Sequence, residues 1–465
     1  MNSAPHTPAQ VQPARRVAFD VISAVSRDDA YANLLLPTLI SRQALNTADA
    51  GLATELTYGT LRMRGYYDRV IALAANRPVT DIDPDILDVL RLGAHQLLAT
   101  RVAPHAAVNE SVALARSVGS RSAVGFTNGV LRTLSRSTPD EWKERVLATT
   151  KTADDRLATE HAHPAWIVRA FRQALSAEGR SDELEALLAA DNAAPRVNLI
   201  ALPGLATPLE DAELNRYSPF GFVLASGDPD SAIRHESGRL RVQDEGSQIA
   251  AIALTRAKPI ADGERWLDLC AGPGGKTALL GAEAAIAGAT VTANEVVPAR
   301  AELVRRAVAP VPGDITVTEL DGTVVGELHP ESFDRILVDA PCTGLGALRR
   351  RPEARWRKTA KDVGDLTKLQ QSLLLSAFAA LKPGGVLAYV TCSPHLAESR
   401  GVVLDSLRRL GDTAELLDTA AVVQSFVREP VDLGEQQTER AGTTVQLWPH
   451  RHGTDAMFIA LLTKV

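Results

Sequence analysis

The chain holds only three cysteines in 465 residues, and each follows an apolar run and has glycine or proline beside it. They lie in the segments Leu269-Cys270-Ala271-Gly272-Pro273-Gly274-Gly275-Lys276, Asp339-Ala340-Pro341-Cys342-Thr343-Gly344 and Val390-Thr391-Cys392-Ser393-Pro394. Cysteines that only fill gaps in a core would show no such preference. The glycine-rich segment after Cys270 predicts a cofactor loop, and Cys342 and Cys392 are candidates for thiol chemistry at one shared cleft.

The chemistry that fits two such thiols is covalent methylation of a cytosine base. Carbon 5 of cytosine is a poor nucleophile, and a thiolate that adds to carbon 6 makes it reactive by splitting one hard step into two. We expect Cys392 to attack, because it ends an apolar strand and Pro394 can begin a helix whose N-terminus favours a thiolate. Cys342 then fits the group that helps release the product, and Asp339 can hydrogen-bond N3 and N4 of the ring.

The segment after Cys270 turns a predicted strand into a predicted helix. Its glycines let a ligand approach the backbone, and the helix N-terminus carries partial positive charge. A phosphate-binding GxxxxGK[ST] loop would need glycine at position 270, and GxGxxG is absent in order. The predicted cofactor-binding residues are Cys270, Ala271, Gly272, Pro273, Gly274, Gly275, Lys276, Glu295, Asp321 and Asp339. Cys270 is expected to contribute backbone and packing.

Acidic residues close four successive predicted strands, at Asp268, Glu295, Asp321 and Asp339. A single acidic residue at a strand end is usually a cap or part of a solvated turn. Four of them at one edge of a parallel sheet, where ligands bind, predict a site. We expect Glu295 to accept both ribose hydroxyls of a nucleoside cofactor and Asp321 to address its adenine amino group.

A run of cations follows the Cys342 segment directly. It includes the predicted RNA-binding residues Arg349, Arg350, Arg351, Arg355, Arg357 and Lys358, and only Glu353 opposes them. Charge runs are often plain solvated faces, but one that adjoins a candidate catalytic motif suits nucleic-acid phosphates. The net charge of −6 does not exclude this, because binding depends on local patches.

The elements that must position these residues fall into four regions. Residues 1–14 are expected to be disordered, residues 15–138 to form a helical bundle, and residues 139–235 to form linker helices and a small α+β subdomain. From 236 to 465 strand and helix patterns alternate, as in a parallel sheet covered on both faces. The expected strands are Arg265–Cys270, Thr290–Glu295, Ile315–Leu320, Phe333–Asp339, Gly385–Thr391 and Ala414–Leu417, with a terminal antiparallel pair at Thr443–Leu447 and Ala456–Thr463.

Composition narrows the class of protein further. Apolar residues make up 45% of the chain, and no run approaches the eighteen apolar residues that a membrane span needs. The first residues show no secretory signal, and three cysteines without paired spacing favour a reducing cytoplasm over disulfides. No CxxC or HExxH motif occurs, so no metal site is expected.

Several segments resemble known families. Tyr31–Leu36, Leu92–Leu97, Val108–Glu110 and Asn128–Arg132 resemble the NusB family of RNA-binding helical bundles, over residues 15–137. Cys270–Thr277, Asp339–Gly346 and Thr391–Pro394 resemble the cofactor loop, DAPCTGLG and TCS motifs of the RsmB/Fmu/Sun (Nop2-like) family of RNA cytosine-C5 methyltransferases. Val242–Ser247, Arg351–Glu353 and Arg355-Trp356 resemble that family too.

The resemblance implies a Rossmann-like class I methyltransferase domain with a seven-stranded mixed sheet, and S-adenosyl-L-methionine as cofactor. It implies Cys392 as nucleophile, Cys342 as the group that assists release, and Lys276, Glu295 and Asp321 with Asp339 around the cofactor. The implied partner is 16S rRNA before or during small-subunit assembly, bound by a monomer. Three departures touch no reacting group: Gly272 replaces alanine, Glu295 replaces aspartate, and Asp455–Phe458 replaces DGFF.

Other functions stay open. The substrate could be tRNA or another RNA, or the protein could be a non-catalytic RNA-binding assembly factor that keeps the fold. DNA cytosine methyltransferases use the thiol of a Pro-Cys motif and need no second strand-end cysteine, so Cys392 argues against that class. A redox enzyme is poorly supported, because the chain has no vicinal cysteine pair.

Overall fold

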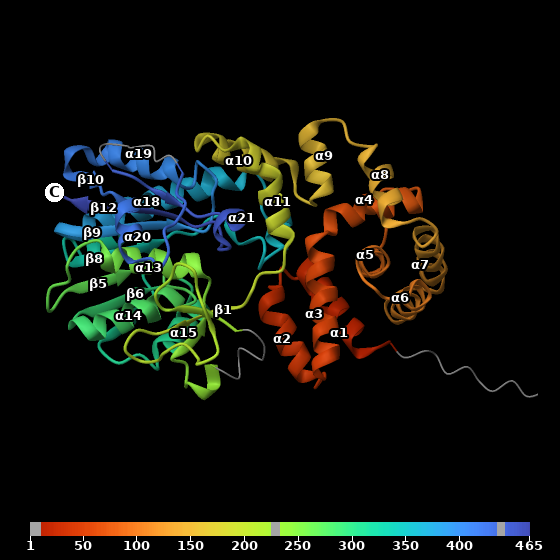
Figure 1. Cartoon of the computed structure of the whole chain (residues 1–465), viewed down its shortest axis with the longest axis horizontal. Helices are drawn as coiled ribbons and strands as arrows, with labels where there is room; N and C mark the ends of the chain where they lie inside the picture. The colour runs from red at the N-terminus through yellow and green to blue at the C-terminus, as the bar shows by residue number, and fades with distance from the viewer. Residues whose placement is uncertain (1–10, 225–232, 435–441) are drawn as a thin grey trace, which may run out of the picture. The chain divides into compact units, whose positions relative to one another are not determined.

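The computed structural model describes residues 11–224, 233–434 and 442–465 (Figure 1). The chain forms two compact units, Met1–Arg169 with Leu348–Arg357, and Ala170–Ala347 with Lys358–Val465. Residues 1–10 of the predicted disordered N-terminus lie outside the described residues, and a helix already begins at Pro13. Ala225, the last residue of a predicted strand, also lies outside them. The four-region division of the chain stays a prediction.

The first unit is helical, as the periodicity of its apolar residues predicts. Its helices are α1 (Pro13–Arg27), α2 (Ala32–Arg42), α3 (Thr47–Arg62), α4 (Arg64–Ala75), η1 (Val79–Asp81), α5 (Pro84–Ala99), α6 (Pro104–Val118), α7 (Arg121–Leu134), α8 (Pro139–Leu147) and α9 (Ala153–Glu160). The Asp83 side chain caps α5 by accepting the Ile86 N–H at 3.3 Å, and the apolar stripe of α5 is buried in the core of the unit.

The second unit begins with α10 (Ala165–Ala177, entered at Ala170), η2 (Ser181–Glu183) and α11 (Leu184–Asn192). A small antiparallel sheet follows in the order β2 (Glu213–Leu214), β3 (Gly221–Val223), β1 (Asn198–Ala201) and β4 (Leu240–Val242).

The large sheet of this unit has the order β10 (Ala414–Leu416), β12 (Phe458–Lys464), β9 (Leu381–Thr391), β8 (Phe333–Asp339), β5 (Arg265–Asp268), β6 (Thr290–Asn294) and β7 (Ile315–Thr318). The five strands β5, β6, β7, β8 and β9 run parallel to one another. Strand β12 is antiparallel to both of its neighbours, β9 and β10. This is the expected seven-stranded mixed sheet, and the short β11 (Val445–Gln446) adds an eighth strand beside β12. The expected pairing of the last two strands is confirmed, but β12 also fills the interior of the sheet.

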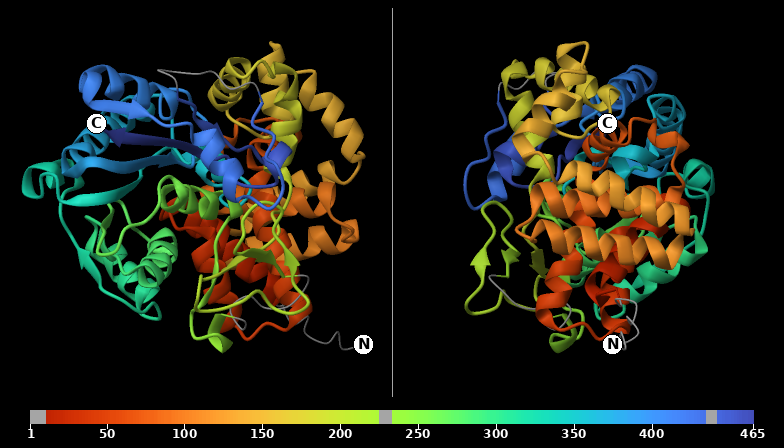
Figure 2. Two further views of the ribbon diagram at one scale, coloured as in Figure 1. Left: turned by 60° about the vertical axis from the view of Figure 1, so that its left-hand side comes forward. Right: turned by 90° about the vertical axis from the view of Figure 1, so that its right-hand side faces the viewer.

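Alternate residues of the central strands face two separate cores. Leu337 and Ala388 join the core beneath α13 (Glu245–Arg256), α14 (Gly275–Ala287) and α20 (Thr419–Phe426). Ile336 and Leu387 join the core beneath α18 (Asp362–Ala380) and α19 (Arg400–Leu410). Helices thus cover both faces of the sheet, as the sequence predicts (Figures 1 and 2). Within the described residues, no helix is long and apolar enough to cross a membrane.

The remaining short helices are α15 (Pro298–Val308), η3 (Gly322–Val324), α16 (Val325–Leu328), η4 (Leu345–Ala347), α17 (Ala354–Arg357), η5 (Gly411–Thr413) and α21 (Pro449–His452). Helix α15 packs over Ala271 and Ala293, beside the glycine-rich loop. Helix α17 belongs to the helical unit, although its sequence neighbours belong to the other unit.

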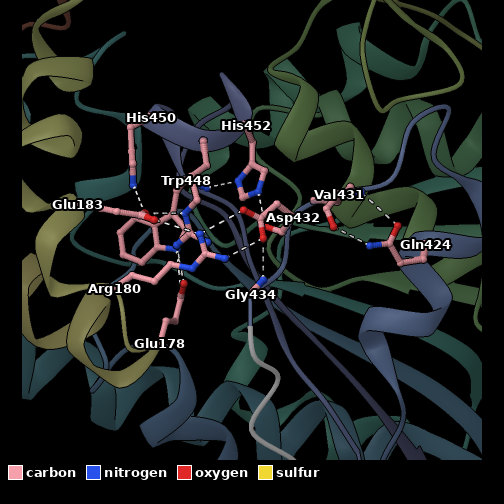
Figure 3. Close-up of polar contacts among 11 residues, drawn as sticks. Glu178, Arg180, Glu183, Gln424, Val431, Asp432, Gly434, Trp448, His450 and His452 are labelled. Atoms are coloured by element: carbon pink, nitrogen blue, oxygen red, sulfur yellow. Dashed lines mark hydrogen bonds and ion pairs between the residues drawn. The ribbon is translucent and has the colours of Figure 1, made fainter.

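A polar network joins the turn between α10 and α11 to the last part of the chain (Figure 3). The Glu178 carboxylate accepts hydrogen bonds from Trp448 Nε1 at 2.9 Å and Arg451 at 2.5 Å. Arg451, buried at 8% exposure, also lies 3.0 Å from Glu183, and Arg180 pairs with Asp432 at 2.8 Å. Each buried cation in this network therefore has a carboxylate partner.

The network borders the segment that carries one of the candidate thiols. Glu178 and Trp448 line a small cavity of about 40 Å³ together with Pro394 and Leu396, which follow Cys392 closely in sequence. The hydrogen bonds of Glu178 and Trp448 in Figure 3 thus hold two residues that line the same cavity as the loop after β9.

Candidate active site

The predicted site residues meet at one edge of the large sheet. Asp268 ends β5, Glu295 follows β6, Asp339 ends β8 and Cys392 follows β9. These strands are parallel, so their carboxyl ends open on the same side, where ligands of such sheets bind. The fold therefore brings together the side chains that the sequence separates by more than a hundred residues.

The glycine-rich loop leads into α14 and packs tightly against α15. Gly274 caps this helix with φ of +104°, and a Cβ there would lie 2.5 Å from the Ala307 side chain. The Thr277 hydroxyl donates to Asp268 at 2.7 Å, and burial of Asp268 raises its pKa to about 7. The loop thus leaves backbone, rather than side chains, to face a ligand.

Glu295 closes this loop from the neighbouring strand. Its carboxylate is 4% exposed and accepts the N–H groups of Gly272 at 3.1 Å and Val297 at 3.0 Å. Arg300 lies 3.3 Å from the same carboxylate and donates to the Gly272 carbonyl at 2.7 Å. A Cβ at position 272 would overlap Glu295 Oε2. The two departures noted in the sequence are therefore one adjustment, in which glycine makes room for the longer acidic side chain.

The carboxamide of Asn294, which the sequence did not single out, ties three strand ends together. Its Nδ2 donates to the carbonyls of Leu269 at 3.2 Å and Leu320 at 3.0 Å. Its Oδ1 accepts from the Thr318 hydroxyl at 2.9 Å and the Leu320 N–H at 2.8 Å. All four hydrogen-bonding positions of the amide are used, which fixes the segment that leads to Asp321.

Asp321 is exposed and holds its own turn. Its Oδ1 accepts the Thr323 N–H at 2.9 Å and the Thr323 hydroxyl at 2.8 Å. These two hydrogen bonds lower its pKa. The structure thus gives this carboxylate a local capping role, and its expected contact with adenine stays a prediction.

The two candidate thiols lie side by side, with 3.4 Å between the Sγ atoms of Cys342 and Cys392. Both are free cysteines at intermediate exposure. The hydrogen bond from Cys342 lowers the pKa of Cys392, against the effect of burial, and it raises the pKa of Cys342 well above its usual value. These two directions favour Cys392 as the thiolate of the pair, with the proton on Cys342.

Lys276 connects the cofactor loop with the thiols. Its Nζ lies 2.7 Å from Asp339 Oδ2, and both side chains are largely buried. Burial lowers the pKa of Lys276, but the charge and hydrogen bond of Asp339, with smaller effects of Cys392 and Asp268, together outweigh it and the pKa rises. The charge of Lys276 favours the Cys392 thiolate, and the charge of Asp339 opposes it.

Backbone contacts hold the motif around Cys342 against the loop that carries Cys392. The Gly346 N–H donates to the Cys392 carbonyl at 2.9 Å, and the Gly346 carbonyl accepts the Ala456 N–H at 2.9 Å. A Cβ at position 346 would overlap the Ala456 carbonyl. Glycine is thus required where three site segments meet. Cys270 differs from Cys342 and Cys392 in its expected role. Burial raises the pKa of its thiol well above the usual value, which disfavours the thiolate.

Two of the six predicted RNA-binding cations, Arg349 and Arg355, are buried. Residues 348–357 fold into the helical unit, and there Arg355 is 0% exposed and donates to the carbonyls of Arg62 at 2.9 Å and Ala162 at 3.3 Å. Arg349 is also buried, at 8% exposure. Both residues are buried in the unit, and this burial argues against the predicted contact of Arg349 and Arg355 with phosphates.

The other predicted cations, Arg350, Arg351, Arg357 and Lys358, are partly exposed. Arg357 donates to the Ala30 carbonyl, and the guanidinium groups of Arg351 and Arg357 lie 5.6 and 4.7 Å from the centre of the Tyr31 ring. An aromatic ring with two cations stays available for RNA at this place, and their contact with RNA stays a prediction.

Comparison with known proteins decides the family. A model described as 16S rRNA methyltransferase RsmB/F matches residues 256–463, and the NusB family model matches residues 12–136. The ribosomal RNA small subunit methyltransferase B of Enterobacter sp. is 33% identical over 413 residues, which cover 85% of this chain and 90% of that protein. The chain belongs to the RsmB/F methyltransferase family.

Other relatives agree with this assignment. Rv1407 of Mycobacterium tuberculosis, named as a methyltransferase, is 49% identical over 461 residues, which cover 98% of this chain and 97% of that protein. The crystal structure of PH0851 superposes with a TM-score of 0.79 at 20% identity and covers 98% of this chain and all of that one. That likeness shows the same fold. The predicted family and the helical NusB domain are confirmed.

Members of the RsmB/F family depend on S-adenosyl-L-methionine, which is therefore the cofactor of this chain. The residues fit that molecule: a glycine-rich loop at a helix N-terminus, an acidic residue after the next strand, and the Lys276–Asp339 pair at the end of β8. The glycine-rich loop would hold the amino-acid and sulfonium end of the cofactor near Cys392.

Proposed function

We propose that this enzyme methylates carbon 5 of a specific cytosine in 16S (small-subunit) rRNA, through a covalent bond between Cys392 and carbon 6. The observation that carries the proposal is the 3.4 Å contact between Cys342 and Cys392, whose hydrogen bond favours the Cys392 thiolate. The ribosomal RNA substrate is supported by the named activity of the Enterobacter relative. Two intact thiols argue against a non-catalytic assembly factor.

In this account the chain supplies the nucleophile and the cofactor supplies an electrophilic methyl group. The Cys392 thiolate adds to carbon 6, and the ring electrons move toward carbon 5 and the N3 side of the base. Asp339, which ends β8, would accept a hydrogen bond from the N4 amino group, and a proton taken up at N3 from solvent and held against its carboxylate would neutralise that charge. The enzyme therefore converts a poor carbon nucleophile into one that can accept the methyl group.

Release requires two further changes. The proton on carbon 5 must leave, and its electron pair must restore the ring double bond as the carbon–sulfur bond breaks. Cys342 is the candidate base: it would first give its own proton to solvent and then take the proton from carbon 5, and its high pKa makes the thiolate a strong base. The sulfur of Cys392 leaves as a thiolate, which regenerates the resting pair.

Around the cofactor, Glu295 would accept the ribose hydroxyls with the lone pairs that its two backbone hydrogen bonds leave unused. Asp321 would face the adenine, and residues 270–276 would contribute their backbone. The helical NusB-like unit and the partly exposed cations near Tyr31 would hold structured RNA through phosphates and stacking. The target cytosine would have to be exposed or flipped into the cleft. A cytoplasmic location and a monomeric state stay predictions.

The test is base-resolved mapping of 5-methylcytosine in RNA treated with the purified full chain and S-adenosyl-L-methionine. A 16S rRNA transcript should gain one methylated cytosine, and a tRNA pool should gain none. Cys392→Ala should reduce transfer to background while still binding the cofactor. Methylation of tRNA alone would show that tRNA, and not 16S rRNA, is the substrate. Methyl transfer by Cys392→Ala would exclude the covalent route through Cys392.

A further inference from the structure

A buried carboxylate joins the two loops that carry the thiols. Glu398 lies between Cys392 and α19 and is 0% exposed. Its Oε1 accepts the Thr343 N–H at 2.8 Å, and its Oε2 accepts the hydroxyls of Thr343 at 2.5 Å and Ser393 at 2.7 Å. Thr343 follows Cys342 and Ser393 follows Cys392, so one side chain bonds the next residue of each cysteine.

Other contacts fix the carboxylate itself. Gln370 of α18 donates to Glu398 Oε1 at 3.2 Å and also to the Pro341 carbonyl at 2.9 Å, just before Cys342. The Tyr389 hydroxyl donates to the Glu398 carbonyl at 2.7 Å from within β9. Glu398 is therefore held from a helix and a strand while it holds both loops.

We propose that Glu398 is a positioning residue of the methyl-transfer site, which keeps Cys342 within hydrogen-bonding distance of Cys392 by bonding Thr343 and Ser393 at once. The inference rests on the proposed function, since it assigns a role toward the two thiols of that reaction. Glu398 itself contacts neither Sγ atom, so it acts through the loops.

The chemistry of the carboxylate explains why glutamate fits this place. An ionised carboxylate only accepts, and its four lone-pair sites match the four donors that surround it. An amide would turn N–H groups toward one pair of those donors, and that pair would lose its acceptor inside the protein. Charge-assisted hydrogen bonds are also stronger than neutral ones, so the clamp is stiff.

The negative charge has a second effect on the thiol pair. The pKa of Cys342 is raised mainly by its hydrogen bond with Cys392 and by burial. The negative charge of Glu398 raises it further. Loss of Glu398 should therefore lower the pKa of Cys342, and separation of the loops should raise the pKa of Cys392. Both effects bring the two apparent thiol pKa values closer together.

The test is titration of the thiols in Glu398→Gln by ultraviolet thiolate absorbance and by iodoacetamide labelling of each cysteine. We expect the two transitions to converge, with slower labelling of Cys392 at neutral pH. In the methylation assay, kcat should fall about 10- to 100-fold, because misplacement by about an ångström costs that much. The KM for S-adenosyl-L-methionine should change little, since Glu398 does not contact the cofactor loop.

Glu245→Gln is the matched control. Glu245 is also buried and accepts the N–H groups of Tyr217 and Ser218, so its loss tests a purely structural carboxylate. It should affect thermal stability and leave the thiol titration as in the parent protein. If Glu398→Gln does not fold, Ser393→Ala is the second variant, because it removes only one donor to Glu398. It should shift the two thiol pKa values in the same directions, by smaller amounts.

A Glu398→Gln or Ser393→Ala protein with the parent's thiol titration and kcat would overturn the proposal, whatever its melting temperature. The titration needs neither RNA nor methyl transfer. A protein without cytosine methylation but with converged thiol transitions would thus contradict the proposed function and leave the positioning role intact.

Discussion

The two halves of the site edge are held in different ways. On the cofactor half, Glu295 bonds two backbone N–H groups, and its ionic partner Arg300 is 51% exposed. On the thiol half, Glu398 is 0% exposed and receives four hydrogen bonds. Exposed ion pairs are weak and screened by salt, whereas buried charge-assisted hydrogen bonds are strong and costly to break.

The difference matches what each half has to do. A cofactor must enter and leave in every cycle, so a loop tied partly by the exposed Arg300 can yield. The two sulfur atoms must keep their spacing while a carbon–sulfur bond forms and breaks, so their loops are clamped from inside. Substitutions on the thiol half should therefore change kcat, and substitutions on the cofactor half should change the KM for the cofactor.

The largest effect on the cofactor half should come from Gly272→Ala. The new Cβ would displace the Glu295 carboxylate, and overpacking of this kind costs about 1–3 kcal/mol. We expect the Kd for S-adenosyl-L-methionine, measured by calorimetry, to rise roughly tenfold or more. The thiol titration should not change.

The same variant has a specific rescue. Glu295→Asp shortens the acidic side chain and should recover most of the cofactor affinity in the Gly272→Ala background, so that the double variant binds better than Gly272→Ala alone. Effects that simply add would show that the two positions are independent, and the overlap would not explain the departure at Gly272.

The smallest effect should follow Arg300→Gln. Because Arg300 is half exposed, its pair with Glu295 contributes about 0.2–1 kcal/mol, and the Kd for the cofactor should rise no more than about fivefold. The effect should shrink as salt is added. Arg306→Gln on the same helix is the control, since Arg306 is exposed and pairs with Glu302 of its own helix. A hundredfold loss of cofactor affinity in Arg300→Gln would contradict the proposed difference between the cofactor half and the thiol half.

The sequence predicted the elements whose side chains repeat regularly. Strand β8 matches the predicted Phe333–Asp339, because its interior residues face buried cores on both sides. Cys342 and Cys392 could be placed at one edge because the ends of adjacent parallel strands must meet. The interior position of β12 could not be predicted, since six of its seven residues are buried but nothing local shows which strands flank it.

Residues that act through tertiary contacts escaped prediction. Glu398 has its role only because Thr343 approaches Ser393 from 50 residues away, and Asn294 only because three strand ends converge on it. The acidic residue five positions after Ser393 was the one available signal. Arg355 was placed on an exposed basic run by composition alone, and the helical unit buries it. Charge patterns show what a side chain can bind but not whether it faces water.

The central claim is that Cys392 attacks the base and Cys342 assists release. The most direct measurement is a denaturing gel of the Cys342→Ala enzyme incubated with labelled 16S rRNA and S-adenosyl-L-methionine. The account predicts a covalent protein–RNA band that is absent when Cys392→Ala is added. A band that requires Cys342 and survives Cys392→Ala would contradict the account and reverse the roles of the two thiols.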